Sequence, residues 1–224
     1  MAGCGPTDAP GDNGGMKDEA TPATLASGQE CAAFAASLMQ ARQTILPKRL
    51  GAPAPSDAQL AQILASAAHA PDHGQLQPWR LIEVPQHARS ALADAFGEAL
   101  RARDGQATPE QVEQAREKAF RSPVLLLVVV DLACGDADIE PAERIVSAGC
   151  AVQNLLLMAT AQGFGSALTS GKALGSAALR ALFGLGESQQ ALCFVNIGTV
   201  VAPKRARVRP QPASYCSVLG AEKR

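Results

Sequence analysis

The clearest hydrophobic pattern in this chain is a continuous apolar run at residues 124–130, directly after Pro123. Its length and its β-branched residues are typical of a strand that is buried on both faces, so we expect it to be the central strand of a sheet. Two shorter β-prone segments, residues 79–84 and 192–197, predict further strands.

Helical patterns lie between these strands. Ser56 stands three residues before Gln59, which is the spacing of a capping box. Thr108 is followed by Pro109 and by Gln111, which is a second helix-start signal. The regions whose apolar spacing or capping residues predict helices are 31–43, 56–68, 92–100, a helix opened by residues 108–111, 141–162 and 174–182. Because strands alternate with helices, the fold class is either α/β or α+β.

The longest predicted helix begins at Pro141 and ends at Gly163, a natural C-cap residue. Apolar residues occupy nearly all of its sides. Such a helix must be buried, either in the core or against a second subunit.

Length and composition indicate one globular domain. The chain has 224 residues, of which 47% are hydrophobic and 18% charged, as in an ordinary globular protein. Residues 1–30 differ, because they are rich in Gly, Pro, Ala, Asp and Thr and contain almost no large apolar residue. We expect a disordered tail over residues 1–30 and a single domain over residues 31–224.

Charge, cysteines and hydropathy limit the partners and the location. The formal net charge of −1 gives no basic face for nucleic acid or an anionic membrane, so small molecules or another copy of the chain are the expected partners. The six cysteines are scattered without a C-x-x-C pair, which indicates reduced thiols. No signal peptide and no membrane-spanning apolar run is recognisable, so we expect a cytoplasmic protein with no membrane or nucleic-acid partner.

A polar loop at residues 69–79 holds two of the three histidines and the only tryptophan. Histidines four apart, such as His69 and His73, form a metal pair when a helix carries both. Pro71 disfavours helical backbone at the residue before it, so the helix should end here. No cysteine or carboxylate cluster completes a ligand set, and we expect no metal site; a planar polar ligand fits the loop better.

Four segments, taken in order, resemble the nitroreductase family, in particular its small single-domain bacterial branch. They are Arg42-Gln43-Thr44; Ala70-Pro71-Asp72-His73 with Gln77-Pro78-Trp79; Ser147-Ala-Gly-Cys150 leading to Asn154; and Gly163-Phe-Gly-Ser166 with Thr169-Ser170-Gly171. The resemblance implies an α+β fold with a central, mostly antiparallel sheet flanked by helices. It also implies a homodimer that binds two FMN molecules at the subunit interface, with NADH or NADPH as reductant.

The resemblance places Arg42, Gln43 and Thr44 at the FMN phosphate, for which a guanidinium fork and a hydroxyl are suitable donors. The family pattern at this triplet is Arg-Arg-Ser, so Gln43 removes one charge. Phosphate binding is therefore expected to be weaker unless Arg207 or Arg209, in the basic C-terminal segment, compensates. Without the resemblance, Arg42 reads equally well as a solvated helix end.

The resemblance also implies that Leu168, Thr169 and Ser170 contact the flavin, although an aromatic residue often stands in the place of Leu168. Residues 158–163, which include Met158 and Gly163, match a stretch associated with the nicotinamide nucleotide. Their other interpretation is a buried helix end with a glycine cap.

From the partner subunit, the resemblance brings His69 and His73 close to FMN. Their other interpretation is a pair of solvated imidazoles at a capped helix end. Trp79 is expected in the core, since a lone tryptophan at a strand start usually packs there.

The activity that the resemblance implies is ping-pong transfer of hydride from NAD(P)H through FMN to a nitroaromatic, a quinone or another flat acceptor. The cofactor carries the chemistry, so no catalytic residue is expected in the protein. The alternative is a flavin-binding dimer with little turnover, in a sensory or storage role, which Gln43 and Leu168 motivate.

Overall fold

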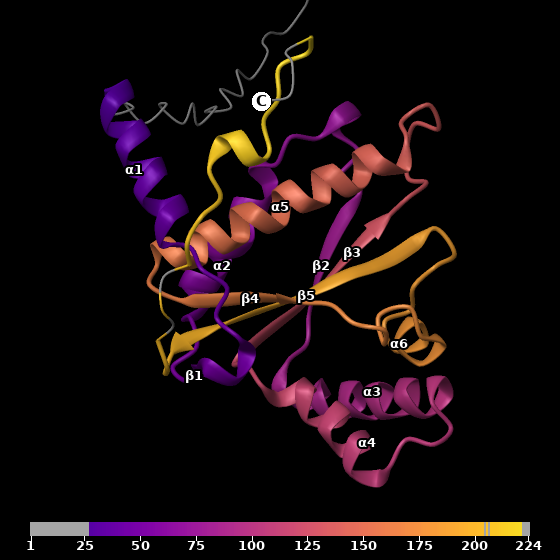
Figure 1. The fold of residues 1–224 in the computed structure, drawn as a ribbon. Helices are drawn as coiled ribbons and strands as arrows, with labels where there is room; N and C mark the ends of the chain where they lie inside the picture. The colour runs from indigo at the N-terminus through magenta and orange to yellow at the C-terminus, as the bar shows by residue number, and fades with distance from the viewer. Residues whose placement is uncertain (1–26, 204, 206, 221–224) are drawn as a thin grey trace, which may run out of the picture.

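A five-stranded antiparallel sheet forms the centre of the molecule in the computed structural model, which describes residues 27–203, 205 and 207–220 (Figure 1). The strand order is β1-β5-β3-β2, and β4 also pairs with β5. The strands are β1 (Leu50–Gly51), β2 (Trp79–Glu83), β3 (Val124–Asp131), β4 (Gly165–Thr169) and β5 (Gln189–Val200). All four pairings are antiparallel, so the predicted mostly antiparallel sheet and α+β class are confirmed.

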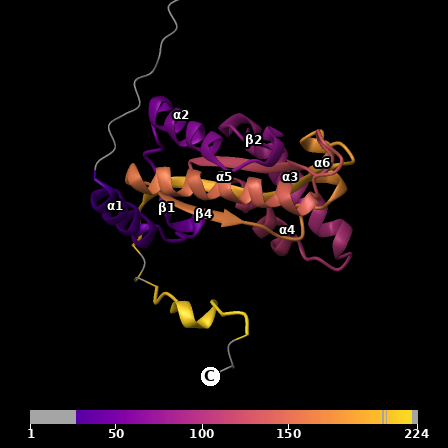
Figure 2. The same ribbon diagram turned by 90° about the horizontal axis from the view of Figure 1, so that it is seen from above.

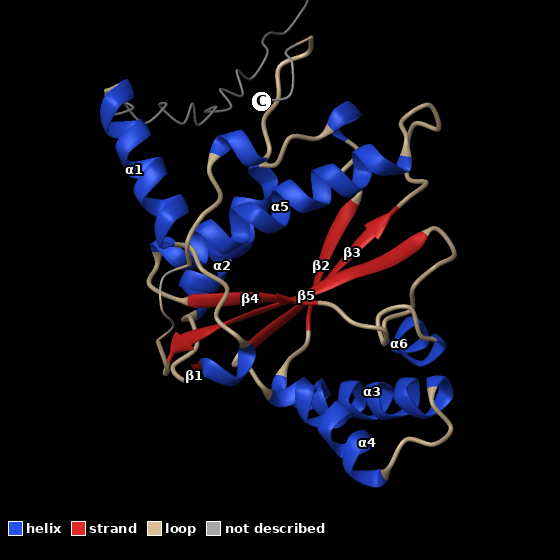
Figure 3. Ribbon diagram, viewed as in Figure 1, coloured by secondary structure: helices blue, strands red, loops and turns tan. Residues whose placement is uncertain are grey.

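Helices cover both faces of the sheet (Figure 3). They are α1 (Gly28–Ala41), α2 (Asp57–Ala65), α3 (Arg89–Arg103), α4 (Pro109–Arg116), α5 (Pro141–Ala161) and α6 (Ala177–Leu182). Short 3-10 turns connect them: η1 (Pro47–Arg49), η2 (Ser66–His69), η3 (His73–Gln75), η4 (Gln86–Ala88), η5 (Glu117–Phe120) and η6 (Pro212–Ser214). The predicted capping boxes at Ser56 and Thr108 are both present.

Side chains that alternate along β3 build two separate cores. Leu126 and Val128 point to the face that α5 and α2 cover, where they pack with Leu155. Leu125 and Leu127 point to the other face and pack with residues of α3 and α6. Because both faces of β3 are covered, a continuous apolar run rather than an alternating one is required, as the sequence predicted.

Helix α5 crosses the whole sheet on one face (Figure 2). It is the one helix in the described residues that is long and apolar enough to cross a membrane by length and composition. Its buried side chains belong to the core, which accounts for that composition. The chain turns after α5 at Gly163, whose φ of +84° suits glycine at a helix end.

The first helix starts earlier than expected. Helix α1 begins at Gly28 rather than at Cys31, because Ser27 and Glu30 form a capping box there. The rest of the expected tail, residues 1–26, lies outside the described residues.

Candidate functional site

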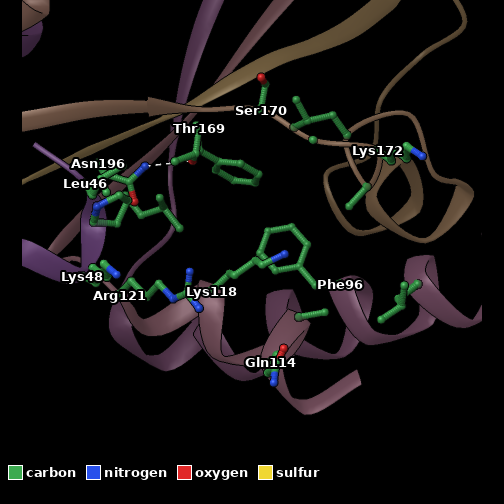
Figure 4. A pocket seen from close by; sticks show the side chains of 18 of the residues that line it. Leu46, Lys48, Phe96, Gln114, Lys118, Arg121, Thr169, Ser170, Lys172 and Asn196 are labelled. Carbon is green, nitrogen blue, oxygen red and sulfur yellow. Dashed lines mark hydrogen bonds between the residues drawn. The ribbon is translucent and has the colours of Figure 1, made fainter. Parts of the chain in front are cut away.

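A pocket of about 720 Å³ opens between the end of β4 and the helices α3 and α4 (Figure 4). That volume is in the range of small-molecule and cofactor sites. Apolar side chains such as Phe96 and Phe194 form its floor, and Thr169 and Ser170 line it at the end of β4. The pocket therefore includes two of the three residues expected to touch a flavin at this strand.

The side chain of Asn196 fixes the end of β4. It is 2% exposed, and its Nδ2 donates to Thr169 Oγ1 at 3.0 Å. Its Oδ1 lies 2.9 Å from the hydroxyl of Ser122, which donates to it from the turn before β3. A buried amide with partners on two other segments joins those segments in one geometry. Asn196 was not among the predicted site residues, although an asparagine inside an apolar strand is a signal for such a network.

Five cationic side chains reach the pocket from different segments, and none of the described residues that line it is acidic. They are Lys48 in η1, Arg103 at the end of α3, Lys118 in η5, Arg121 in the turn before β3, and Lys172 in the loop after β4. All five are exposed to solvent. These five residues were not predicted as site residues, because only the fold brings their separate positions together.

Arg89 holds the segment that carries two of these cations. Its guanidinium is 1% exposed and donates to the backbone carbonyls of Val84, Ala119, Ser122 and Pro123, at 2.6 to 3.3 Å. Burial lowers the pKa of Arg89 from its ordinary value, and the nearby Glu83 carboxylate opposes that shift. One buried side chain thus fixes the backbone on both sides of Arg121.

The predicted phosphate triplet lies where α1 leads into the sheet. Thr44 forms a bridge with Ser166 at the start of β4, so the triplet is tied to the strand whose far end lines the pocket. Arg209 Nη2 donates to the carbonyl of Arg42 at 2.7 Å. Desolvation chiefly, and then repulsion from Arg209, lower the pKa of Arg42. Of the two C-terminal arginines, Arg209 therefore reaches the triplet, whereas the side chain of Arg207 is exposed and forms no hydrogen bond or ion pair with the described residues.

Gln43 lies in this triplet with an unpartnered polar atom. Its Oε1 is buried without a hydrogen-bond partner, as is the hydroxyl of Ser166 beside the bridge. Buried polar atoms are usually paired in native proteins. The unpartnered atoms of Gln43 and Ser166 lie in the region of Arg42 and Arg209, and a bound polar ligand could supply their missing hydrogen-bond partners.

The histidine loop is anchored to the start of α5. His73 Nδ1 and Glu143 Oε2 are 2.7 Å apart, and this hydrogen bond is the main reason that the pKa of Glu143 is lowered. Asp72 accepts a hydrogen bond from the backbone N–H of Gln77 at 2.6 Å, which closes the loop. Ala70 has extended backbone with ψ of 142°, so the helix ends before Pro71 as predicted. Both imidazoles are exposed.

The predicted site residues form two groups in one chain. Met158 and Gly163 lie at the C-terminal end of α5, near α1 and the start of β4, on the side of the triplet (Figure 1). His73 lies at the N-terminal end of α5, and His69 lies in η2, which packs along α5. Helix α5 has 21 residues and is about 30 Å long, so His73 does not meet Arg42 within one chain. Leu168 is 44% exposed and does not line the pocket.

An antiparallel sheet covered by helices, with a pocket of cofactor size at a strand end, defines an α+β protein with a candidate small-molecule site. Comparison with known sequences identifies the protein family. The sequence model of the nitroreductase family matches residues 39–199, and the chain belongs to that family of oxidoreductases.

Known relatives agree with this assignment. A Haemophilus influenzae protein named "Putative NAD(P)H nitroreductase" is 36% identical over 152 residues, which are 68% of this chain and 82% of the relative. The Escherichia coli K12 protein named "Putative NAD(P)H nitroreductase YdjA" is 33% identical over 152 residues, which are 67% of this chain and 81% of the relative.

Solved structures show the same fold. A nitroreductase-like family protein from Bacillus cereus has a TM-score of 0.66 at 19% identity, and the match covers 83% of this chain and 96% of the other. The FMN and NADPH-dependent nitroreductase NfnB from sphigopyxis sp. strain HMH has a TM-score of 0.62 at 21% identity, covering 84% and 99%.

Proposed function

We propose that this protein is an FMN-dependent oxidoreductase that passes electrons from NADH or NADPH to nitroaromatics, quinones or similar flat acceptors. The observation that carries the proposal is the position of Thr169 and Ser170. These are the residues that family resemblance assigns to the flavin, and they line a pocket of about 720 Å³ in a chain of the nitroreductase family. The relatives named NAD(P)H nitroreductases and the FMN-dependent structural neighbour support the same cofactors.

The side chains present fit FMN. Arg42, Thr44 and Arg209 would hold the phosphate, since guanidinium and hydroxyl groups are the donors that a phosphate requires. Thr169 and Ser170 would contact the ring. Bound FMN supplies hydride transfer.

The overall reaction balances with one hydride and one proton. NAD(P)H loses a hydride, and with a proton from solvent the acceptor gains two electrons. A nitro group then becomes a nitroso group and water, and a quinone becomes a hydroquinone. Because one pocket serves the reductant and the acceptor in turn, we expect ping-pong kinetics.

A homodimer in the cytoplasm is part of the proposal. Large apolar side chains are exposed on α1 (Phe34, 67%) and α5 (Val146, 65%), and on the C-terminal segment (Leu219, 104%). Residues 207–220 are exposed throughout and extend away from the body (Figure 2). Apolar surface of this kind favours a second copy of the chain. A second copy would bring its own His69 and His73 to the site from the far end of its α5.

Absorbance of the purified protein tests the proposal. We expect a yellow protein, or one that takes up added FMN, whose flavin is bleached by NADH or NADPH under anaerobic conditions and reoxidised by a nitroaromatic. Replacing Arg209 by Gln should raise the Kd for FMN about tenfold, since a charge-assisted hydrogen-bond donor is lost. Arg205→Gln, which removes an equal charge from the same segment, is the matched control. A protein that takes up no FMN refutes the proposal.

A flavin-binding dimer with little turnover is the second candidate. The unpartnered Oε1 of Gln43, at a position where the family pattern has a cation, favours it. Steady-state kinetics separate the two functions. Tight FMN binding without acceptor-dependent oxidation of NADH or NADPH would favour the second candidate.

A further inference from the structure

The charge of the pocket wall differs sharply from that of the whole chain. The chain has 20 Lys and Arg residues and 21 Asp and Glu residues, so its charges nearly cancel. Among the described residues, the wall has five cations and no acid. A concave surface of one sign concentrates the field and raises the local concentration of ligands of the opposite sign.

These cations have no partners in the described part of the chain. The side chains of Lys48, Lys118, Arg121 and Lys172 form no ion pair or hydrogen bond there, and neither does that of Arg103. The neighbouring Arg116, on α4, differs because it pairs with Asp94 and Glu113. Carboxylates are therefore present on α3 and α4, but none of them lines the pocket.

Two of the cations flank Thr169 on backbone that the fold holds in place. Lys172 follows Thr169 by three residues in the loop after β4. Arg121 precedes Ser122, whose hydroxyl donates to Asn196, and Asn196 in turn donates to Thr169. Figure 4 shows Arg121 on the side of Lys48 and Asn196, and Lys172 on the loop at the opposite side. Arg103 is weaker evidence for a ligand, because a cation in the last turn of a helix is stabilised by the helix dipole whether or not a ligand binds.

We propose that the pocket selects an electron acceptor that carries an anionic group, and that Lys172 and Arg121 are its specificity-determining residues. The acceptor class is a flat aromatic or quinone that bears a carboxylate or a similar anion. A carboxylate matches the guanidinium fork of Arg121 on one side of the pocket, and the charge of Lys172 on the opposite side adds to the field that attracts an anion. The anionic group takes no part in electron transfer, so the stoichiometry remains that of the proposed function, on which this inference rests.

A pair of acceptors that differ in charge but hardly in shape tests the inference. The holoenzyme is assayed with 4-nitrobenzoate and 4-nitrobenzamide at saturating NADH, as wild type and as Lys172→Gln and Arg121→Gln. For each acceptor, kcat/KM of a variant is divided by kcat/KM of the wild type. The different reduction potentials of the two acceptors therefore do not affect the comparison. Arg101→Gln is the matched control, because Arg101 is an exposed cation of α3 that does not line the pocket.

For each pocket variant we expect kcat/KM for nitrobenzoate to fall about five- to tenfold, mostly through KM, as for the loss of one partly solvated charge-assisted hydrogen bond. The value for nitrobenzamide should change less than twofold, and Arg101→Gln should change neither. Raising the salt concentration should reduce the preference for nitrobenzoate in the wild type, because exposed charges are screened. Calorimetric titration with benzoate and benzamide, which the enzyme cannot reduce, should show the same loss of anion affinity.

Three results would overturn the inference. Both acceptors losing rate equally would mean that the cations act on reduction itself. Loss of FMN from the variants would assign the cations to the cofactor, and a raised KM for NADPH but not NADH would assign them to the reductant's phosphate. In each case the wild type still reduces nitrobenzamide, so the proposed function stands. A wild type that reduces neither acceptor refutes the proposed function instead.

Discussion

Arg89 offers a sharp test of how the fold supports the pocket. Replacing it by Met keeps most of the side-chain volume but removes the charge and all four hydrogen bonds to carbonyl oxygens. Hydrogen bonds from a charged donor contribute about 1.5–3 kcal/mol each, but the cost of burying the guanidinium offsets much of their sum. Removing one member of such a buried network costs about 3–5 kcal/mol, so we expect a loss of that size.

That loss is a large part of the total stability of a typical domain, about 5–15 kcal/mol. Urea unfolding measures it, with the fluorescence of Trp79, the only tryptophan, as a probe that is partly buried against the core beside α5. Arg89→Lys, which keeps the charge but cannot reach all four carbonyls, should lie between the wild type and Arg89→Met. Arg101→Met, on the exposed side of the same helix, is the control and should change stability by about 0.5 kcal/mol or less. A loss below about 1 kcal/mol for Arg89→Met would refute the argument that the four carbonyls depend on this side chain.

Two further predictions concern titratable groups. Burial raises the pKa of Cys193 to about 11, so its thiol should resist alkylation at pH 8 while the exposed Cys216 reacts, as peptide mapping by mass spectrometry will show. The folded pKa lies above the ordinary value of 9.0, so this thiol contributes stability below pH 9 that is lost as the pH rises toward 11, an effect that Cys193→Ala should remove. Glu143 has its pKa lowered chiefly by His73, so carbon-13 NMR should find its carboxyl titrating below the ordinary value in the wild type and closer to it in His73→Gln. The folded pKa is the lower one, so this contribution to stability is present above the ordinary pKa and is lost as the pH falls; equal titration in the two proteins would contradict the pairing.

Local patterns predicted much of the fold. The apolar run at residues 124–130 is strand β3, and the helix opened by Pro141 is α5. These predictions succeed because burial on both faces, capping and proline placement depend on residues close together in sequence. Trp79 packs against the core beside α5, as expected.

Strand β4 and the cationic wall escaped the sequence analysis. The residues of β4 follow Gly163 without a clear apolar alternation, and the strand exists because it pairs with β5 over Phe194–Gly198. Lys172 and Arg121 look like ordinary surface charges, since each is isolated in the sequence. Only the pairing of β4 with β5, and the hold of Arg89 on the turn before β3, bring them to one pocket.

The two ends of α5 explain why the predicted site is divided. Resemblance assigned one ligand to Arg42, Thr44, His69 and His73, yet His73 lies at one end of α5, which is about 30 Å long, and Arg42 lies toward the other end. The His73–Glu143 and Asp72–Ser147 contacts tie the loop to α5, so the loop cannot swing across that distance without breaking both. A site that needs both the Arg42 triplet and the histidine loop must therefore take the triplet from one chain and the histidine loop from a second chain. Mixing an Arg42→Gln chain with a His73→Gln chain tests this, because a mixed dimer would hold one intact site and recover FMN binding that the two variants lack, whereas a monomeric site would recover nothing.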